Sequence, residues 1–384
     1  MRQRAITSLY ALAFLFTIHF SISVYINSSF LGTILPTKFV GIVYTLGSLF
    51  TIVAFFGIPK ILREAGDYKT TMRLLTLLLL SLVAIIIFKN PIIVVAAFIV
   101  NVVAVSLVYF NIDVILENFT TNKETGKVRG SFLTASNIAW VMAPLLASLI
   151  LADTEIYRRV YIVAALLLLP TLYILRRNFK DFKDPTYRSI SLLSAIKGLL
   201  VNKNLRLICL SMFILHFFFS WMVIYMPIYL HEYIGFNWRE IGIMLSIALL
   251  PYVVLELPLG KLADTRWGEK EILSIGFAIS ALGAAGVFFI EGGDFFTWTA
   301  ILVVTRIGAS MVEIMSETYF FKVVDAAQID VLSFFRMMRP FAYIVGPLSG
   351  TLLLLFVSYK TLFLILGAIT LYGLRYSLAL KDTK

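Results

Sequence analysis

The chain has 384 residues, of which 60% are hydrophobic and only 14% are charged. A soluble domain exposes far more charge, so this composition excludes a soluble globular protein and favours one embedded in a membrane. The net charge of +11 could by itself suggest nucleic acid as a partner. The basic residues, however, lie mostly between apolar runs, where the positive-inside rule accounts for them, and we expect no nucleic-acid partner.

Twelve apolar runs organise the sequence. Because about 20 apolar residues cross the roughly 30 Å of hydrocarbon in a bilayer, each run can form one spanning helix. The runs lie near residues 5–27, 38–58, 71–89, 91–117, 130–152, 157–175, 205–230, 239–260, 271–290, 296–321, 332–356 and 360–379. Residues 74–88 are apolar on every side, unlike the alternating strands of a β-barrel. We therefore predict an all-α membrane protein with twelve transmembrane helices.

The first run, at 5–27, is longer than the apolar region of a signal peptide, and no small-residue cleavage site closes it, so we interpret it as a span. Placing the N-terminus in the cytoplasm puts most of the 33 lysines and arginines on the cytoplasmic side. We predict an integral, multi-pass protein of the cytoplasmic (inner) membrane with both termini in the cytoplasm. We expect a monomer whose basic loops meet anionic lipid headgroups.

A long polar stretch divides the spans six and six. The predicted parts are an N-terminal six-helix bundle at 1–176, a cytoplasmic linker at 177–204 and a C-terminal six-helix bundle at 205–384. Within the linker, Ser191 to Val201 has one apolar face, which predicts an amphipathic helix along the membrane surface.

The two halves also match each other in sequence at offsets of 200 to 203 residues. The matching pairs are Gly41 and Gly242, Gly66 and Gly268, Glu117 and Glu317, Ser131 and Ser333, and Pro144 and Pro347. Five pairs in the same order indicate a duplication. Since six is an even number, both copies enter the membrane in the same orientation, and parallel repeats of this kind place a substrate site near the midplane between the halves.

The segment between the eighth and ninth runs carries the sharpest motif. It reads GKLADTRWGEK from Gly260 to Lys270, preceded by ELPL from Glu256. A Gly-x-Leu-Ala-Asp followed by Gly268 and basic residues resembles the loop signature of the major facilitator superfamily. The resemblance implies that family's fold of two pseudo-symmetric six-helix bundles, and secondary transport by alternating access. It covers the whole chain in architecture, although only residues 256–270 match closely.

In the family picture, the acid of this loop, which is Asp264 in this sequence, faces the start of the fifth span, around Arg129. A helix N-terminus there offers unsatisfied N–H groups to a carboxylate. The resemblance thus implies that Asp264 pairs near Arg129 while the cytoplasmic side is closed. The eleventh run carries Gly346-Pro347, similar to the family's glycine–proline motif.

Polar residues inside spans are costly, so each is a candidate for function. At 1.5 Å of rise per residue, Arg306, His216 and Asn101 lie about 14 to 16 Å deep, and His19 roughly 20 Å from the inside. These residues fall on spans one, four, seven and ten, which line the central cavity in the family that the chain resembles. We predict that they bind substrate. Arg306 is the best candidate because a guanidinium can hold a carboxylate or phosphate bidentately; the alternative is a structural ion pair with Glu313.

The acidic residues gather near the cytoplasmic ends of the spans. Two pairs repeat a spacing that puts both carboxylates on one helix face: Asp113 with Glu117, and Glu313 with Glu317. The charged residues of this level are Asp113, Glu117, Glu256, Glu313, Glu317, Arg129, Arg336 and Arg339. We interpret them as a cytoplasmic salt-bridge gate. If a proton gradient drives transport, Glu313 is the expected titrating group.

Other functions have less support in the sequence. The histidines are scattered and no catalytic spacing occurs, so we predict neither an enzyme nor a cofactor. The lone Cys209 excludes a cysteine metal cluster, and we expect no metal site. The sequence predicts a secondary active transporter of a small solute that works by alternating access, and any concentrative transport must draw on a proton or other ion gradient or on a partner, since no ATP-binding motif occurs. A flippase for lipids or lipid-linked substrates and a drug efflux pump are the alternatives on the same fold.

Overall fold

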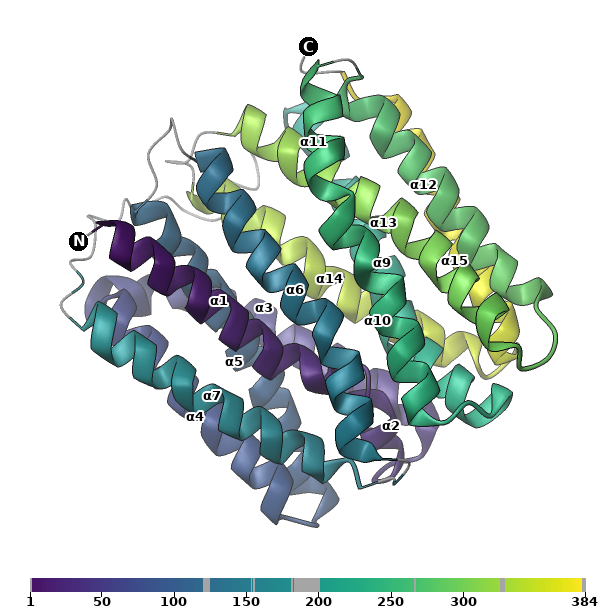
Figure 1. The fold of residues 1–384 in the computed structure, drawn as a ribbon, viewed down its shortest axis with the longest axis horizontal. Coiled ribbons are helices and arrows are strands. Elements are labelled where there is room, and N and C mark those ends of the chain that lie inside the picture. Colours follow the sequence, from purple (N-terminus) through teal and green to yellow (C-terminus); the bar gives the residue numbers. More distant parts are fainter. Residues whose placement is uncertain are drawn as a thin grey trace. The chain divides into compact units, whose positions relative to one another are not determined.

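A computed structural model describes residues 2–119, 125–152, 154, 156–180, 182, 201–265, 267–324 and 329–381. The chain forms two compact units, Met1–Arg188 and Ser189–Lys384, each with its own set of packed helices (Figure 1). The division falls within residues 177–204, whose expected amphipathic helix lies outside the described residues except for its end at Val201.

The N-terminal unit is a bundle of long helices. Its elements are α1 (Arg2–Val24), α2 (Asn27–Gly32), the 3-10 turn η1 (Thr37–Phe39), α3 (Val40–Ala65), α4 (Asp67–Ile87), α5 (Pro91–Asn118), α6 (Thr125–Leu151) and α7 (Arg158–Phe179). Helix α1 packs on α6 and α7, α5 packs on α3 and α4, and α4 also packs on α7.

The C-terminal unit is a second bundle. Its elements are α9 (Lys203–Ile228), the π-helical turn η2 (Tyr229–Ile234), α10 (Trp238–Val254), α11 (Glu256–Thr265), α12 (Glu269–Gly286), the 3-10 turn η3 (Val287–Phe289), α13 (Phe295–Val323), α14 (Ile329–Leu353) and α15 (Tyr359–Leu378). Helix α9 packs on α14 and α15, α13 packs on α10 and α12, and α12 also packs on α15.

These two packing schemes are the same. If α9 stands for α1, α10 for α3, α12 for α4, α13 for α5, α14 for α6 and α15 for α7, each of these helix contacts in one unit has its counterpart in the other. The sequence offset of about 200 residues therefore relates two units with one internal architecture, as a duplication requires.

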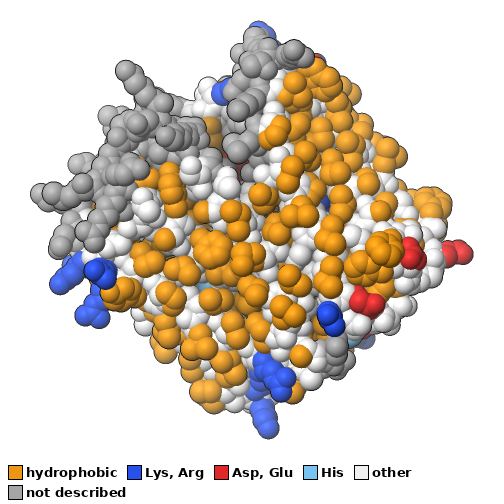
Figure 2. Space-filling view, in the orientation of Figure 1, with side chains coloured by type: hydrophobic (Ala, Val, Ile, Leu, Met, Phe, Trp, Pro, Cys, Tyr) orange, Lys and Arg blue, Asp and Glu red, His pale blue; other side chains and the backbone are white. Residues whose placement is uncertain are grey.

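Eleven helices in the described part of the chain are long and apolar enough to cross a membrane. They match eleven of the twelve predicted runs; α10 and α11 together supply one span, Trp238–Gly260. The remaining run, 332–356, corresponds to α14, whose 25 residues include Arg336, Arg339 and two prolines that lower its hydropathy. Hydrophobic side chains are spread widely over the visible face, as Figure 2 shows.

Polar residues fix the helix ends of the C-terminal unit. Asn237 and Glu240 form a reciprocal capping box at the start of α10, each side chain accepting a backbone N–H of the other residue. Asp294 caps α13, and hydrogen bonds donated by the Thr297 hydroxyl and backbone N–H hold the pKa of this carboxyl below its ordinary value. Gly235, at φ +91°, ends η2 in a left-handed conformation that favours glycine.

Glycines bring α12 and α13 into close contact. A Cβ added at Gly308 would overlap the backbone N of Ser280 and lie 2.5 Å from the carbonyl O of Gly276. Real Cβ atoms do not approach backbone so closely, so the two helices could keep this distance only if Gly308 remained glycine.

We expect Gly308→Ala to destabilise the protein by about 1 to 3 kcal/mol, because the added methyl group forces α12 and α13 apart. The measurement is the apparent melting temperature of the purified protein in detergent. Gly57→Ala is the matched control: it also lies inside a helix, but its added Cβ meets nothing within 4 Å. Equal melting temperatures for the two variants would contradict the close contact.

Candidate functional site

Arg306 lies in the interior of the C-terminal unit, on α13. Its side chain is among the largest that are fully buried, with 2% of the residue exposed. Its Nε and Nη2 atoms are buried without a hydrogen-bond partner, and no ion pair joins it to any described carboxylate. The ion pair with Glu313, the alternative to a substrate role for Arg306, is therefore absent from the contacts of the described residues. A buried guanidinium with free donors is rare, because an unmade charged hydrogen bond costs free energy.

Aromatic rings of α9 flank this guanidinium. The Arg306 Cζ lies 5.8 Å from the ring centroid of Phe218 and 5.7 Å from that of Phe219. These are cation–π distances, and they compensate part of the cost of burial. The ring of His216 lies 6.0 Å from that of Phe219, and its Nδ1 is buried with no hydrogen-bond partner in the described residues. Two of the four predicted midplane residues, His216 on α9 and Arg306 on α13, thus both lie beside the ring of Phe219.

Further charges of α13 and α14 surround this position. Arg306, Arg336 and Arg339 all lie close enough to Glu313 to interact with it electrostatically, as does Glu317. Arg336 and Arg339 also act on His216. We call these six residues the Arg306 cluster: His216, Arg306, Glu313, Glu317, Arg336 and Arg339. Three guanidiniums and two carboxylates give the cluster a net charge of +1 with His216 neutral.

Within the cluster, Arg336 and Glu317 form a bidentate ion pair. Arg336 Nη1 and Nη2 donate to the two carboxylate oxygens of Glu317, the second bond at 3.1 Å. Both residues belong to the C-terminal unit, so this pair fastens α14 to α13. Glu313 has no such bond among the described residues, and its carboxylate is the one in the cluster left without a direct partner. The wider gate between the halves stays a prediction.

The other two midplane candidates form hydrogen bonds inside the N-terminal unit. His19 on α1 is buried, and its Nδ1 lies 2.8 Å from the carbonyl O of Ala164 on α7. Asn101 on α5 donates from Nδ2 to the hydroxyl of Ser81 on α4, at 3.1 Å. Both contacts tie neighbouring helices together, and a substrate role for either residue stays a prediction.

Several predicted gating residues have side chains outside the described part of the structure. They are Asp264, Arg129, Glu117 and Glu256. Asp113 is half-buried on α5. Gly260 lies within α11 and has open space where a Cβ would be, and Gly268 precedes the first residue of α12. The pairing of Asp264 near Arg129 therefore also stays a prediction.

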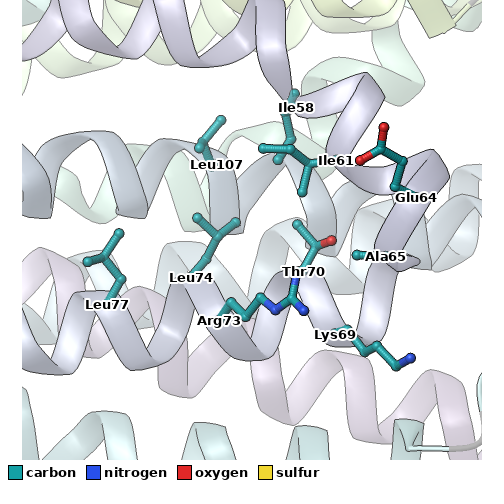
Figure 3. Close-up of a pocket in the computed structure, with 10 residues that line it drawn as sticks. All are labelled: Ile58, Ile61, Glu64, Ala65, Lys69, Thr70, Arg73, Leu74, Leu77 and Leu107. Carbon is teal, nitrogen blue, oxygen red and sulfur yellow. The ribbon is translucent and has the colours of Figure 1, made fainter.

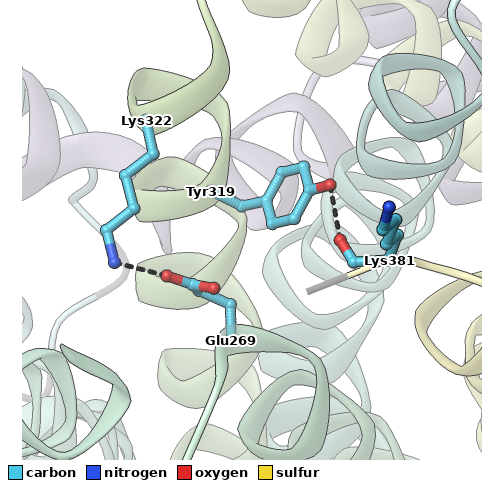
Figure 4. A network of polar contacts seen from close by, with 4 residues as sticks. All are labelled: Glu269, Tyr319, Lys322 and Lys381. Atoms are coloured by element: carbon cyan, nitrogen blue, oxygen red, sulfur yellow. Dashed lines mark hydrogen bonds and ion pairs between the residues drawn. The ribbon is translucent and has the colours of Figure 1, made fainter. Parts of the chain in front are cut away.

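The sequence analysis missed one buried acid, Glu269. It follows Gly268 directly and is 1% exposed, and its Oε1 lies 2.6 Å from Lys322 Nζ on α13, with which it forms an ion pair (Figure 4). Beside it, the Tyr319 hydroxyl donates to the backbone O of Lys381, which holds the chain beyond α15. The internal repeat could have pointed to Glu269, because an acid follows the matching glycine in both halves. In the first half this acid is Asp67, which follows Gly66 and is 0% exposed.

Rings also gather on α1, α5 and α6 of the N-terminal unit. The ring of Phe20 lies 5.9 Å from that of Tyr109 and 5.7 Å from that of Trp140, and all three side chains are half-buried. The Tyr109 hydroxyl donates to Thr17 at 2.9 Å. No cluster of three or more potential metal ligands occurs among the described residues.

Two bundles of helices long and apolar enough to span a membrane, with one packing scheme, define a multi-pass membrane protein. The sequence matches the family model of the Major Facilitator Superfamily over residues 9–248 and 208–381. The chain therefore belongs to the Major Facilitator Superfamily, a family of transporters rather than enzymes. A comparison with curated protein sequences gave no match.

Solved structures of this family share the fold at low sequence identity. The nucleoside transporter NupG is 18% identical, with a TM-score of 0.75 over 98% of each chain. An auto-inhibited POT family peptide transporter is 11% identical, with a TM-score of 0.79 over 99% of this chain and 98% of the other. The human organic anion transporter MFSD10 is 12% identical, with a TM-score of 0.70 over 98% of this chain and 99% of the other.

We expect Glu269→Gln to lower the stability of the C-terminal unit by about 1 kcal/mol, because it removes the charge that holds Lys322 and leaves the side-chain shape unchanged. Thermal unfolding in detergent measures this. Glu271→Gln is the control, since Glu271 lies in the same first turn of α12 but is exposed. Identical unfolding of both variants would show that the ion pair contributes nothing.

Proposed function

We propose that this transporter carries a small anionic solute, whose carboxylate or phosphate binds Arg306. The observation that carries the proposal is the buried guanidinium whose Nε and Nη2 have no partner. A guanidinium stays charged at any relevant pH and offers two parallel N–H donors to a planar anion. A bound anion would satisfy the donors that the described residues leave free.

The surroundings of Arg306 favour an anion over a neutral or cationic guest. The Arg306 cluster has a net charge of +1, and in surroundings of low dielectric even one uncompensated charge acts strongly. The rings of Phe218 and Phe219 both lie at cation–π distance from the guanidinium and restrict its orientation before an anion binds. Such preorganisation lowers the entropic cost of binding.

For the transport cycle, we propose alternating access of the two units in the cytoplasmic membrane, with both termini in the cytoplasm. The shared packing scheme supports this proposal, because parallel repeats allow each unit to move as a body. The orientation rests on the excess of lysine and arginine in the loops assigned to the cytoplasm.

The structural neighbours do not select the substrate, since they are named as carriers of nucleosides, peptides and organic anions on one fold. A flippase for lipid-linked substrates is a second candidate function, because a headgroup phosphate would meet the same guanidinium. The two differ in the size of the guest: a flippase needs the acyl or isoprenoid part for binding, whereas a carrier of small solutes does not.

Thermal-shift screening of the purified protein tests the substrate class. We expect small carboxylates or phosphate esters to raise the melting temperature, since a ligand of the folded state stabilises by mass action. Arg306→Gln should weaken the best hit by about tenfold or more, because two charge-assisted hydrogen bonds are lost. Counterflow in proteoliposomes should fall in parallel.

Arg375→Gln is the control for this experiment. Arg375 belongs to the same unit, but it is exposed on α15 and contacts Tyr372. If the Arg306 variant bound and exchanged the anion as well as the control does, the proposal would be wrong. Stabilisation by neutral solutes alone would also contradict it.

We further propose that Glu313 couples transport to protons. Its carboxylate lies among Arg306, Arg336, Arg339 and Glu317 and lacks a direct partner in the described residues. Protonation of Glu313 raises the net charge of the Arg306 cluster from +1 to +2, which favours binding of an anion. Because linkage is reciprocal, a bound anion then favours the proton, and the two travel together as in symport.

We expect Glu313→Gln to retain counterflow but to lose accumulation driven by a pH gradient. The substitution imitates the protonated carboxyl, so the affinity for the anion should rise and become independent of pH between about 5 and 8. Transport with and without an imposed gradient in proteoliposomes gives the comparison. Glu291→Gln, an exposed acid of the same unit, is the control. Accumulation that survives Glu313→Gln would exclude this residue as the coupling group.

A further inference from the structure

A cavity of about 550 Å³ opens between α3, α4 and α5 of the N-terminal unit. Its lining residues are Ile58, Ile61, Glu64, Ala65, Lys69, Thr70, Arg73, Leu74, Leu77 and Leu107 (Figure 3). This volume is in the range of sites for small organic ligands. No residue of the Arg306 cluster takes part, since the cavity and the cluster belong to different units.

The cavity exists because α3 and α4 diverge from the turn that joins them. Gly66 makes this turn at φ +80°, and α3 and α4 contact each other far less than each contacts α5. Helix α5 therefore forms the floor of a groove whose walls are α3 and α4. In a membrane, a groove with exposed apolar walls does not stay empty.

The polar and apolar residues of the cavity occupy different ends. Figure 3 shows Leu77 and Leu74 toward one end, Lys69 toward the other, and Arg73 between them. Lys69 and Arg73 are four residues apart on α4, so they lie on one helix face, and both are exposed. Neither forms an ion pair or a hydrogen bond with the described residues. Glu64 is the one carboxylate of the lining, so the charged end carries a net charge of +1.

The length of the groove matches one leaflet of a bilayer. From the first residue of α4, Asp67, to Leu77 the helix rises about 15 Å, and the hydrocarbon core is roughly 30 Å thick. When Leu77 and Leu107 lie near the middle of the bilayer, Lys69 lies about 12 Å nearer the headgroups, and Arg73, about 6 Å from Leu77 along α4, extends its long side chain toward them. The neighbouring wall is open to lipid, since Ile61 is 45% and Leu77 is 44% exposed.

We propose that this groove binds one anionic phospholipid. Its phosphate contacts Lys69 and Arg73, and one acyl chain lies along Leu74, Leu77 and Leu107. The lipid fills the space between α3 and α4 and holds the turn at Gly66, so it stabilises the N-terminal unit. Charge complementarity, the leucine wall and the depth of one leaflet all select a phospholipid over a soluble anion or a protein segment.

Native mass spectrometry of the purified protein with added phosphatidylglycerol or phosphatidylcholine tests the proposal. We expect one tightly bound phosphatidylglycerol and weaker binding of phosphatidylcholine. The double variant Lys69→Gln/Arg73→Gln should bind phosphatidylglycerol about tenfold or more weakly, because two basic contacts near the headgroup are lost.

A matched control keeps the change in charge but moves it away from the groove. Arg176→Gln/Lys180→Gln also removes one arginine and one lysine four residues apart, at the exposed end of α7. We expect this variant to retain the tight phosphatidylglycerol. Equal loss of the lipid in both double variants would overturn the proposal, because it would show a diffuse effect of charge.

A third variant tests the acyl chain. Leu77→Trp fills the apolar end without changing any charge, and it should weaken phosphatidylglycerol binding while the protein stays folded, as judged by its melting temperature. Glycerol phosphate, which carries the headgroup phosphate without acyl chains, should not bind. Binding of glycerol phosphate as tight as that of the lipid, or a lipid-free dimer seated through this groove, would overturn the proposal.

Discussion

The cost of burying a charge in an apolar helix bundle constrains this molecule more than any other factor. Arg306 is 2% exposed on α13, and no described carboxylate pairs with it directly. Two phenylalanine rings of α9 compensate part of that cost, and the carboxylates of Glu313 and Glu317 contribute at longer range. The packing of α9, α13 and α14 thus holds a cation that a bound anion would stabilise further.

The internal duplication separates the charged residues that both units share from those that occur at a matching position in only one unit. At an offset of 200 residues, Glu313 and Glu317 correspond to Asp113 and Glu117, so the paired acids are common to both units. Arg306 corresponds to Ser106, whose hydroxyl bonds only to the carbonyl of Val102 one turn earlier. The acids therefore belong to the repeated architecture, whereas the buried guanidinium of Arg306 has no counterpart at the matching position of the N-terminal unit.

Hydropathy predicted the helices well because a spanning helix must be apolar along about 20 residues. Helix α14 shows the limit of that signal, because it contains Arg336 and Arg339 of the Arg306 cluster, which lower its hydropathy. The side-chain partners could not be predicted in the same way. His19 meets a carbonyl 145 residues away, which depends on how α1 packs on α7. The alternative pair of Arg306 with Glu313 does not form among the described residues, because seven residues are two helical turns, about 10 Å, and two side chains on one helix face at that separation need not meet.

A cation without a direct partner suits a carrier better than a fully paired one. A guanidinium in a direct ion pair would have to break that pair for every substrate, and a guanidinium with no compensation would hold its substrate too tightly to release it. Phe218, Phe219 and the more distant acids place Arg306 between these extremes. In the proposed role of Arg306, the empty and loaded states would differ little in free energy, and interactions that differ between the two conformations would drive the cycle.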